Sequence, residues 1–234
     1  MDGNLKFLIY LVWKIRMMVL VVMGVMTNWG RISTHALWLR YDGGSGDDTI
    51  LFTDGRQYTT DDIINGGLGT DSITVLLGLA AGADHDAGTQ SGLSNIENIT
   101  YVQQGANVVT VDLITADANF VATDATISGA GVSGVMTINA AAETDSNVTI
   151  LGGTGNDILT GGTNPTKVDT ISGGLGADTI TGGRGSDILT GGAGADIFEL
   201  SNTCGNDIIK DYNKNEGDQI RFLFQTGDTE QITC

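Results

Sequence analysis

A tandem repeat between Gly152 and Glu199 constrains the fold of this chain of 234 residues more than any other feature. Five consecutive units there begin with a Gly-Gly pair, and four of the five are nine residues long. The regular units read GGTGNDILT, GGLGADTIT, GGRGSDILT and GGAGADIFE, and the longer unit GGTNPTKVDTIS follows the first of them. Three glycines in six residues disfavour helix and regular strand, because glycine loses the most backbone entropy on ordering. Each unit therefore predicts a tight turn followed by a three-residue strand.

Two turns and two strands would complete one coil of a solenoid every eighteen residues, with neighbouring coils about 4.8 Å apart. One apolar residue of each strand is expected to point inward and form a narrow aliphatic core. The predicted core residues are Ile158, Ile171, Ile180, Ile188 and Ile197, with Leu159, Leu189 and Phe198 as additions.

The pattern G-G-x-G-x-D-x-U-x, where U is a large apolar residue, resembles the calcium-binding nonapeptide of the RTX (repeats-in-toxin) family. The resemblance implies an all-β fold with a parallel β-roll, a calcium-stabilised solenoid, at the C-terminal side. Two further matches stand apart, at Gly43–Leu51 and Gly66–Thr74. These two units lack a same-edge partner eighteen residues away, so calcium at Asp48 and Asp71 requires that their two loops stack on each other.

The spacing of the aspartates gives a physical reason for a cation. Residues eighteen apart share one edge of a solenoid, which places Asp157, Asp178 and Asp196 on one edge and Asp169, Asp187 and Asp207 on the other. Like charges roughly 5 Å apart repel by about 1 kcal/mol per pair in water and by more in a less polar setting. Calcium removes this repulsion by binding six to eight carboxylate and carbonyl oxygens. The candidate ligands for several Ca²⁺ ions are Asp48, Asp71, Asp157, Asp169, Asp178, Asp187, Asp196 and Asp207 together with Gly153, Gly155, Gly174, Gly176, Gly183, Gly185, Gly192 and Gly194.

Composition divides the chain into four predicted regions. Residues 1–40 form an apolar and basic segment, 41–151 a strand-rich region with two isolated nonapeptides, 152–210 the β-roll, and 211–234 a capping segment whose aromatic residues cover the open end. For the first segment three interpretations remain open: a signal or membrane anchor within residues 5–26, a buried or interfacial helix, and a start unrelated to function.

The middle region predicts short strands separated by turns every ten to fifteen residues, as in a solenoid or a sandwich, and we favour a parallel solenoid. The predicted strands are Ser72–Leu77, Ile99–Val102, Val108–Leu113, Ala125–Ser128, Val135–Ala140 and Val148–Leu151. His85, between Asp84 and Asp86, is interpreted as part of a polar loop tip rather than as a metal ligand.

Charge and motifs restrict the function. The formal net charge is −17, and beyond residue 40 six basic residues stand against 27 acidic ones, which argues against a nucleic-acid partner. The chain lacks H-E-x-x-H, G-x-S-x-G, a P-loop and a dinucleotide fingerprint, so we expect no enzyme activity. The two cysteines, Cys204 and Cys234, leave one disulfide open as an alternative.

Two functions are compatible with these observations. The first is a calcium-folded structural or adhesive module of a secreted bacterial surface protein similar to S-layer-like proteins, with self-association or a cell-surface partner. The second is the carrier part of a secreted hydrolase or toxin without its catalytic domain. The resemblance implies an extracellular location for both, and a membrane contact only if residues 5–26 act as an anchor.

Overall fold

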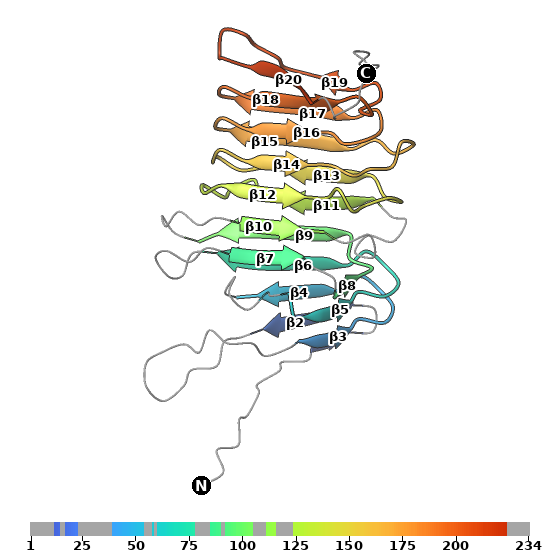
Figure 1. Cartoon of the computed structure of the whole chain (residues 1–234). Helices are drawn as coiled ribbons and strands as arrows, with labels where there is room; N and C mark the ends of the chain where they lie inside the picture. The colour runs from blue at the N-terminus through green and yellow to red at the C-terminus, as the bar shows by residue number, and fades with distance from the viewer. Residues whose placement is uncertain are drawn as a thin grey trace.

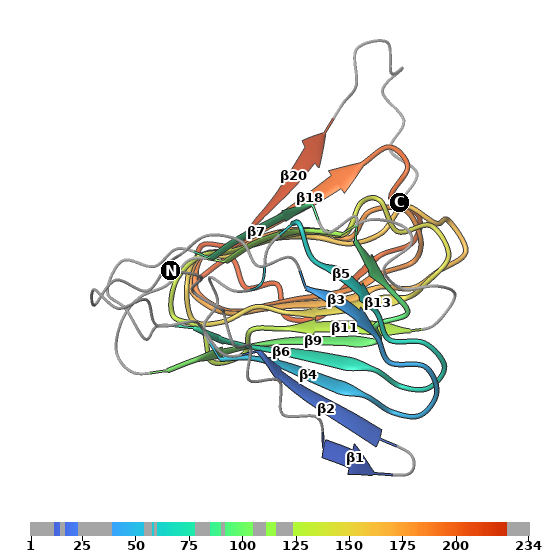
Figure 2. The same ribbon diagram turned by 90° about the horizontal axis from the view of Figure 1, so that it is seen from below.

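The computed structural model describes residues 12–14, 17–22, 39–53, 58, 60–77, 85–89, 92–104, 111–115 and 124–223. These residues form strands that stack into a solenoid, from β2 and β3 at the N-terminal end to β19 and β20 at the C-terminal end (Figure 1). Seen along the stack, two sheets lie on opposite sides of a narrow interior (Figure 2). Neighbouring strands are parallel throughout, except the pair β1 and β2.

The sheets consist of ten, seven and three strands. The long sheet has the order β1 (Val12–Lys14), β2 (Met17–Val22), β4 (Thr49–Phe52), β6 (Ser72–Leu77), β9 (Asn98–Gln103), β11 (Ala125–Ser128), β13 (Val148–Leu151), β15 (Thr170–Leu175), β17 (Ile188–Ala193) and β19 (Ile208–Ile209). The opposite sheet has the order β20 (Gln219–Leu223), β18 (Ile197–Ser201), β16 (Thr179–Thr181), β14 (Ile158–Thr160), β12 (Met136–Asn139), β10 (Val111–Ile114) and β7 (His85–Thr89). A small sheet of β3 (Arg40–Asp42), β5 (Ile63–Asn65) and β8 (Leu93–Ser94) lies at the N-terminal end.

The core consists of two ladders of apolar side chains that are completely buried. In the long sheet, the strand register aligns Ile50, Ile73, Ile99, Ile127, Ile150, Ile171 and Leu189. In the opposite sheet it aligns Leu113, Ile138, Leu159, Ile180 and Phe198. Burial alternates along strands such as β6 and β17, as expected when successive side chains point to opposite faces. The parallel solenoid predicted for the C-terminal roll and favoured for the middle region is confirmed.

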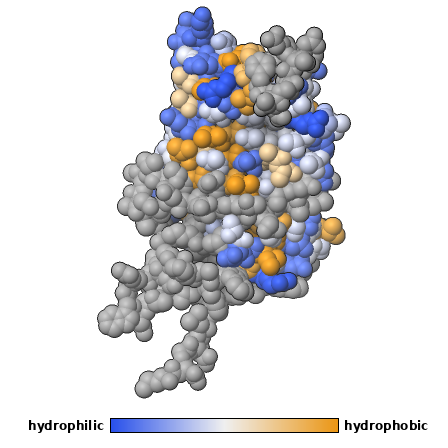
Figure 3. All heavy atoms as spheres, viewed as in Figure 1, coloured by the Kyte–Doolittle hydropathy of each residue, from blue (hydrophilic) through white to orange (hydrophobic). Residues whose placement is uncertain are grey.

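Three of the predicted core residues were assigned to the wrong face. Ile158 is 48% exposed, and Ile188 and Ile197 are only half-buried, whereas their neighbours Leu159, Leu189 and Phe198 are buried. In these three strands the inward residue is the second after the aspartate, because the aspartate itself is fixed at the turn and the strand alternates from there. Ile158 belongs to the outer surface, where apolar and polar residues are mixed (Figure 3).

Several strand predictions in the middle region are correct. β6, β11 and β13 have the predicted ends, and β9 and β12 differ by one or two residues. Residues 108–110 of the predicted strand Val108–Leu113 lie outside the described residues, and its C-terminal part is β10. His85 was wrongly interpreted as part of a loop tip, since it is the first residue of β7.

Most of residues 1–40 lie outside the described residues, but β1 and β2 belong to this segment. β2 pairs in parallel with β4, so Met17–Val22 extends the long sheet and is not helical. Among the described residues, no helix has the length and apolar character needed to cross a membrane.

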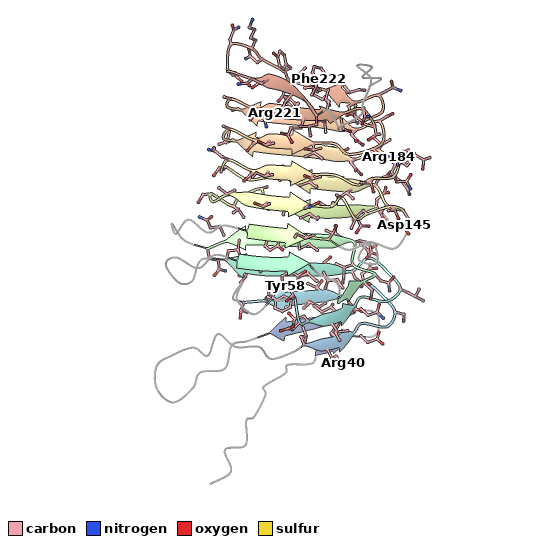
Figure 4. All side chains as sticks on the ribbon, in the orientation of Figure 1. Arg40, Tyr58, Asp145, Arg184, Arg221 and Phe222 are labelled. Carbon is pink, nitrogen blue, oxygen red and sulfur yellow. The ribbon has the colours of Figure 1, made fainter. Side chains whose placement is uncertain are left out.

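The predicted cap has a different structure from that expected. β20 pairs with β18 in register, so it adds one more strand, and all five of its residues are exposed. Phe222 lies at the C-terminal end of the stack (Figure 4), where it is 47% exposed, and Tyr212 is 45% exposed. The prediction that these aromatics cover the open end stays a prediction. Within the same segment, strand pairing by β20 and aspartate side chains, described below, contact the last coil of the roll.

Candidate metal centres at the stacked glycine loops

The Gly-Gly loops lie at the turns between the sheets and stack directly on one another. In the loops that begin at Gly43, Gly66, Gly173, Gly182 and Gly191, the glycines at the second and fourth positions have positive φ, for example 111° at Gly174 and 121° at Gly176. Glycine adopts this conformation without steric cost. The two isolated units also stack, because Gly46 N–H donates to the carbonyl of Leu68 (2.7 Å) and Leu68 N–H to that of Gly44 (2.9 Å). The condition set for calcium at Asp48 and Asp71 is thus met by the loop geometry.

The aspartates of successive coils form hydrogen-bonded columns. On the edge before the opposite sheet, Oδ1 of Asp178 accepts the N–H of Asp157 (2.7 Å), and Oδ1 of Asp196 accepts that of Asp178 (2.9 Å). Oδ1 of Asp218 then accepts the N–H of Asp196 (3.0 Å). The predicted column of Asp157, Asp178 and Asp196 is therefore present, and Asp218 extends it.

The second edge, before the long sheet, repeats this arrangement. Asp169 donates its N–H to Oδ1 of Asp187, and Asp187 donates to Oδ1 of Asp207, both at 2.9 Å. Asp48 and Asp71 lie on the same edge further along the stack, where the N–H of Asp48 donates to Oδ1 of Asp71 (2.8 Å). The separation between stacked aspartates varies from 18 to 23 residues, so coils of different length keep their loops aligned.

The second carboxylate oxygen divides these aspartates into two groups. In the described part of the chain, Oδ2 is buried and has no hydrogen-bond partner in Asp71, Asp178, Asp187, Asp196 and Asp207. In Asp157 and Asp169, Oδ2 accepts the N–H of a glycine in its own loop, Gly153 (2.7 Å) and Gly162 (2.6 Å). A buried carboxylate oxygen without a partner is unfavourable unless a cation or a proton compensates it.

Oxygen atoms crowd the first glycine of each loop and line the position where a side chain would begin. A methyl group at Gly43, Gly66, Gly152, Gly161, Gly173, Gly182 or Gly191 would lie within 2.7 Å of Oδ2 of the aspartate in the same loop. At Gly173 it would also lie within 2.7 Å of the carbonyl oxygen of Gly191, in the next coil. Oδ2 of Asp178 and the carbonyl oxygen of Gly191 therefore lie close to each other beside Gly173, and carboxylate and carbonyl oxygens are the ligands that a hard cation such as calcium prefers.

The acidity of these groups reflects their environment. Burial, with a contribution from the neighbouring aspartate charges, raises the pKa of Asp178 and Asp187 to about 7. Burial also raises the pKa of Asp71, Asp157, Asp169, Asp196 and Asp207 above the ordinary value. The buried carboxylates of the loops therefore repel one another when every carboxylate is ionised and no cation is bound.

The ligand atoms at these loops suit calcium better than a transition metal. Within the described residues, no three His, Cys, Asp or Glu side chains converge as they would around a transition metal. Cys204 is buried and disulfide-bonded, so it is not a thiolate ligand. At Gly43, Gly66, Gly152, Gly161 and Gly173 a carboxylate oxygen lies beside a backbone carbonyl oxygen of another coil, and both are ligands suited to calcium.

Sequence reasoning missed several residues of these columns. Asp218 continues a column, and the motif Asp218-Gln219-Ile220 repeats the D-x-U pattern that could have revealed it. Asp211 accepts the N–H groups of Gly191 (2.9 Å) and Gly192 (2.8 Å), a role for which the sequence carries no repeat signal. These two carboxylates bind to the last loops of the roll and close it.

The fold and its loops define the class: a parallel β-roll, which is a structural and calcium-binding architecture. The family of the RTX calcium-binding nonapeptide repeat matches the chain in four copies, over residues 59–78, 144–164 and 167–198. No curated protein and no solved structure matches the chain. The chain thus contains RTX calcium-binding nonapeptide repeats, and these repeats imply that it binds calcium.

Proposed function

We propose that this chain is a calcium-folded structural module of a secreted bacterial surface protein, in which calcium ions bind between stacked loops. The observation that carries the proposal is the set of buried Oδ2 atoms without a hydrogen-bond partner, which at Asp71 and Asp178 lie beside a carbonyl oxygen of the adjacent coil. A bound calcium ion would satisfy these oxygens and would convert its binding energy into folding energy.

The loops differ in how readily they would bind an ion. Asp71, Asp178, Asp187, Asp196 and Asp207 present an oxygen for which the described structure gives no other partner. In Asp157 and Asp169 the same oxygen already accepts the amide of Gly153 or Gly162. The carbonyls of Gly153, Gly155, Gly174 and Gly176 point along the stack toward the glycines of the next coil, which makes them suitable further ligands.

The extracellular part of the proposal has independent support. A disulfide at Cys204 is stable in oxidising compartments and rare in the cytosol. Calcium outside the cell is abundant enough to fold such a module after export. A rigid stack of parallel strands without a recognised catalytic motif favours a structural or adhesive role on the cell surface.

A calcium titration of the full chain, followed by circular dichroism, tests calcium-dependent folding. We expect a gain of β signal with calcium and little change with magnesium, which requires stricter octahedral geometry. The double variant Asp178→Asn/Asp187→Asn should lose most of this gain, whereas Asp61→Asn, at an exposed position outside the columns, should keep it. Full β signal in chelator, unchanged by calcium, would refute the proposal.

A further inference from the structure

The turn that follows the second isolated unit contains no glycine, yet it occupies the next position in the stack. Leu93 pairs with Ile64 and Ser94 with Asn65, so the residues after β8 lie over the loop Gly66–Asp71. Gly66 N–H donates to the carbonyl of Ser94 (3.0 Å), which fixes this register. Only three residues, Asn95 to Glu97, separate β8 from β9, where the glycine loop below has six.

Asn95 replaces the first glycine of a nonapeptide. It is the one non-glycine residue with positive φ (53°) in the described part of the chain, and asparagine tolerates this conformation better than most residues. Its carbonyl oxygen lies within 2.7 Å of the position that a methyl group on Gly66 would take. The carbonyl of Gly66 has the same relation to Gly43, and that of Gly191 to Gly173.

Glu97 replaces the aspartate of the nonapeptide. Its Oε2 accepts the N–H of Asp71 (2.6 Å), as Oδ1 of Asp71 accepts the N–H of Asp48. Glutamate has one methylene more than aspartate, which allows a carboxylate to reach the column from a shorter turn. The side chain of Asn95 donates to Oδ1 of Asn65 (2.7 Å) and holds the turn on the loop below.

The pocket between this turn and the loop contains an oxygen in need of a partner. Asp71 is fully buried, and its Oδ2, which has no hydrogen-bond partner, lies within 2.7 Å of the methyl position on Gly66. We propose that the turn Asn95–Glu97 is a glycine-free half-site that completes a calcium pocket with the loop Gly66–Asp71. This inference rests on the proposed function, because it assumes that the oxygen-lined pockets bind calcium.

The pocket lies outside the C-terminal run of repeats and partly outside the segments that match the family. Residues 93–98 follow the matched range 59–78 and precede the matched range 144–164. The half-site thus gives the N-terminal end of the solenoid an ion of its own, separate from those of residues 152–210.

Calcium counting on three full-length variants tests the half-site. Asn95→Val should lose one bound ion per chain in equilibrium dialysis, because a β-branched residue disfavours positive φ. Asn95→Gly, which accepts positive φ, should bind as many ions as the natural chain. Glu97→Gln keeps an oxygen that accepts the Asp71 N–H but removes the negative charge. This variant should bind one of its calcium ions at least tenfold more weakly.

The outcomes separate this inference from the proposed function. If Asn95→Val and Glu97→Gln bind the same number of ions with unchanged affinity, the turn is structural only and the half-site is refuted. If Asn95→Val loses several ions together, this variant has failed to fold. The calcium affinity of Glu97→Gln then decides whether the half-site exists. A natural chain that binds no calcium would overturn the proposed function as well, and magnesium dialysis serves as the matched control.

Discussion

The first glycine and the aspartate of each loop depend on each other. Oδ2 of Asp178 occupies the space where a side chain at Gly173 would begin, and Oδ2 of Asp196 does the same at Gly191. Oδ1 of each carboxylate is fixed by an amide of the preceding coil, so the side chain cannot turn away without losing that hydrogen bond. The requirement for glycine at the first position is therefore steric and arises from the carboxylate, because φ is positive only at the second and fourth positions.

Replacement of Gly173 by alanine tests this dependence. The new methyl group would collide with Oδ2 of Asp178 and the carbonyl of Gly191, and overpacking of this kind costs about 1–3 kcal/mol. We expect a lower melting temperature in calcium and weaker calcium binding, measured by thermal unfolding and calorimetry. Gly131→Ala is the control, because a methyl group there meets no atom within 4 Å. Equal behaviour of the two variants would contradict the steric argument.

At the scale of the strand, the aspartate sets which apolar neighbour enters the core. In β17, Leu189 is completely buried while the adjacent Ile188 is not, although both are large aliphatic residues. Alternation in a strand permits either choice. The hydrogen bond from Asp169 N–H to Oδ1 of Asp187 fixes the phase, so the second residue after the aspartate points inward.

Two alanine variants of β17 measure this difference in burial. Leu189→Ala should destabilise the calcium-bound protein by about 2–5 kcal/mol, because it removes a completely buried side chain and leaves a cavity. Ile188→Ala, one residue earlier, should lower the free energy of unfolding clearly less. Chemical denaturation gives both values, and a larger loss for Ile188→Ala would show that the strand has the opposite phase.

Across the whole molecule, stability depends on how the stacked charges are compensated. The chain has a net charge of −17, and its buried carboxylates lie in columns along two edges. A solenoid is stabilised mainly by contacts between neighbouring coils, so unfavourable charge in one loop is transmitted to the next. Calcium or protons can both relieve it.

A lower pH should therefore stabilise the calcium-free fold, but it should weaken the binding of calcium. In chelator, the pKa of Asp178 and Asp187 rises from 3.8 in the unfolded chain to about 7 in the folded one, so the folded state binds more protons between these values. The stability of the calcium-free fold is then highest near pH 4 and falls as pH rises toward 7. Calcium requires deprotonated ligands, so its binding should strengthen over the same interval.

Circular dichroism at pH 5 and pH 8 tests how the calcium-free fold and the binding of calcium each depend on pH. Chelator-treated protein should keep more β signal at pH 5, and the midpoint of the calcium titration should fall as pH rises. In Asp178→Asn/Asp187→Asn both dependences should become smaller. A calcium-free protein that gains stability from pH 5 to pH 8 would exclude this account.

The repeat, the strand positions and the two aspartate columns could be predicted from sequence because they depend on local features. Gly-Gly pairs mark turns, and short alternating runs such as Ala125–Ser128 and Val148–Leu151 mark strands between them. Asp157, Asp178 and Asp196 are two units apart in the repeat, at separations of 21 and 18 residues, which places them on one edge.

The tertiary structure alone decided which loops meet across coils of unequal length. The stacking of Gly43–Leu51 on Gly66–Thr74 and the contribution of Asn95 and Glu97 depend on hydrogen bonds between residues 23 to 30 positions apart. The same holds for the contact of Asp211 with the amides of Gly191 and Gly192. These contacts follow from the packing of whole coils around a shared core, which no local pattern of residues encodes.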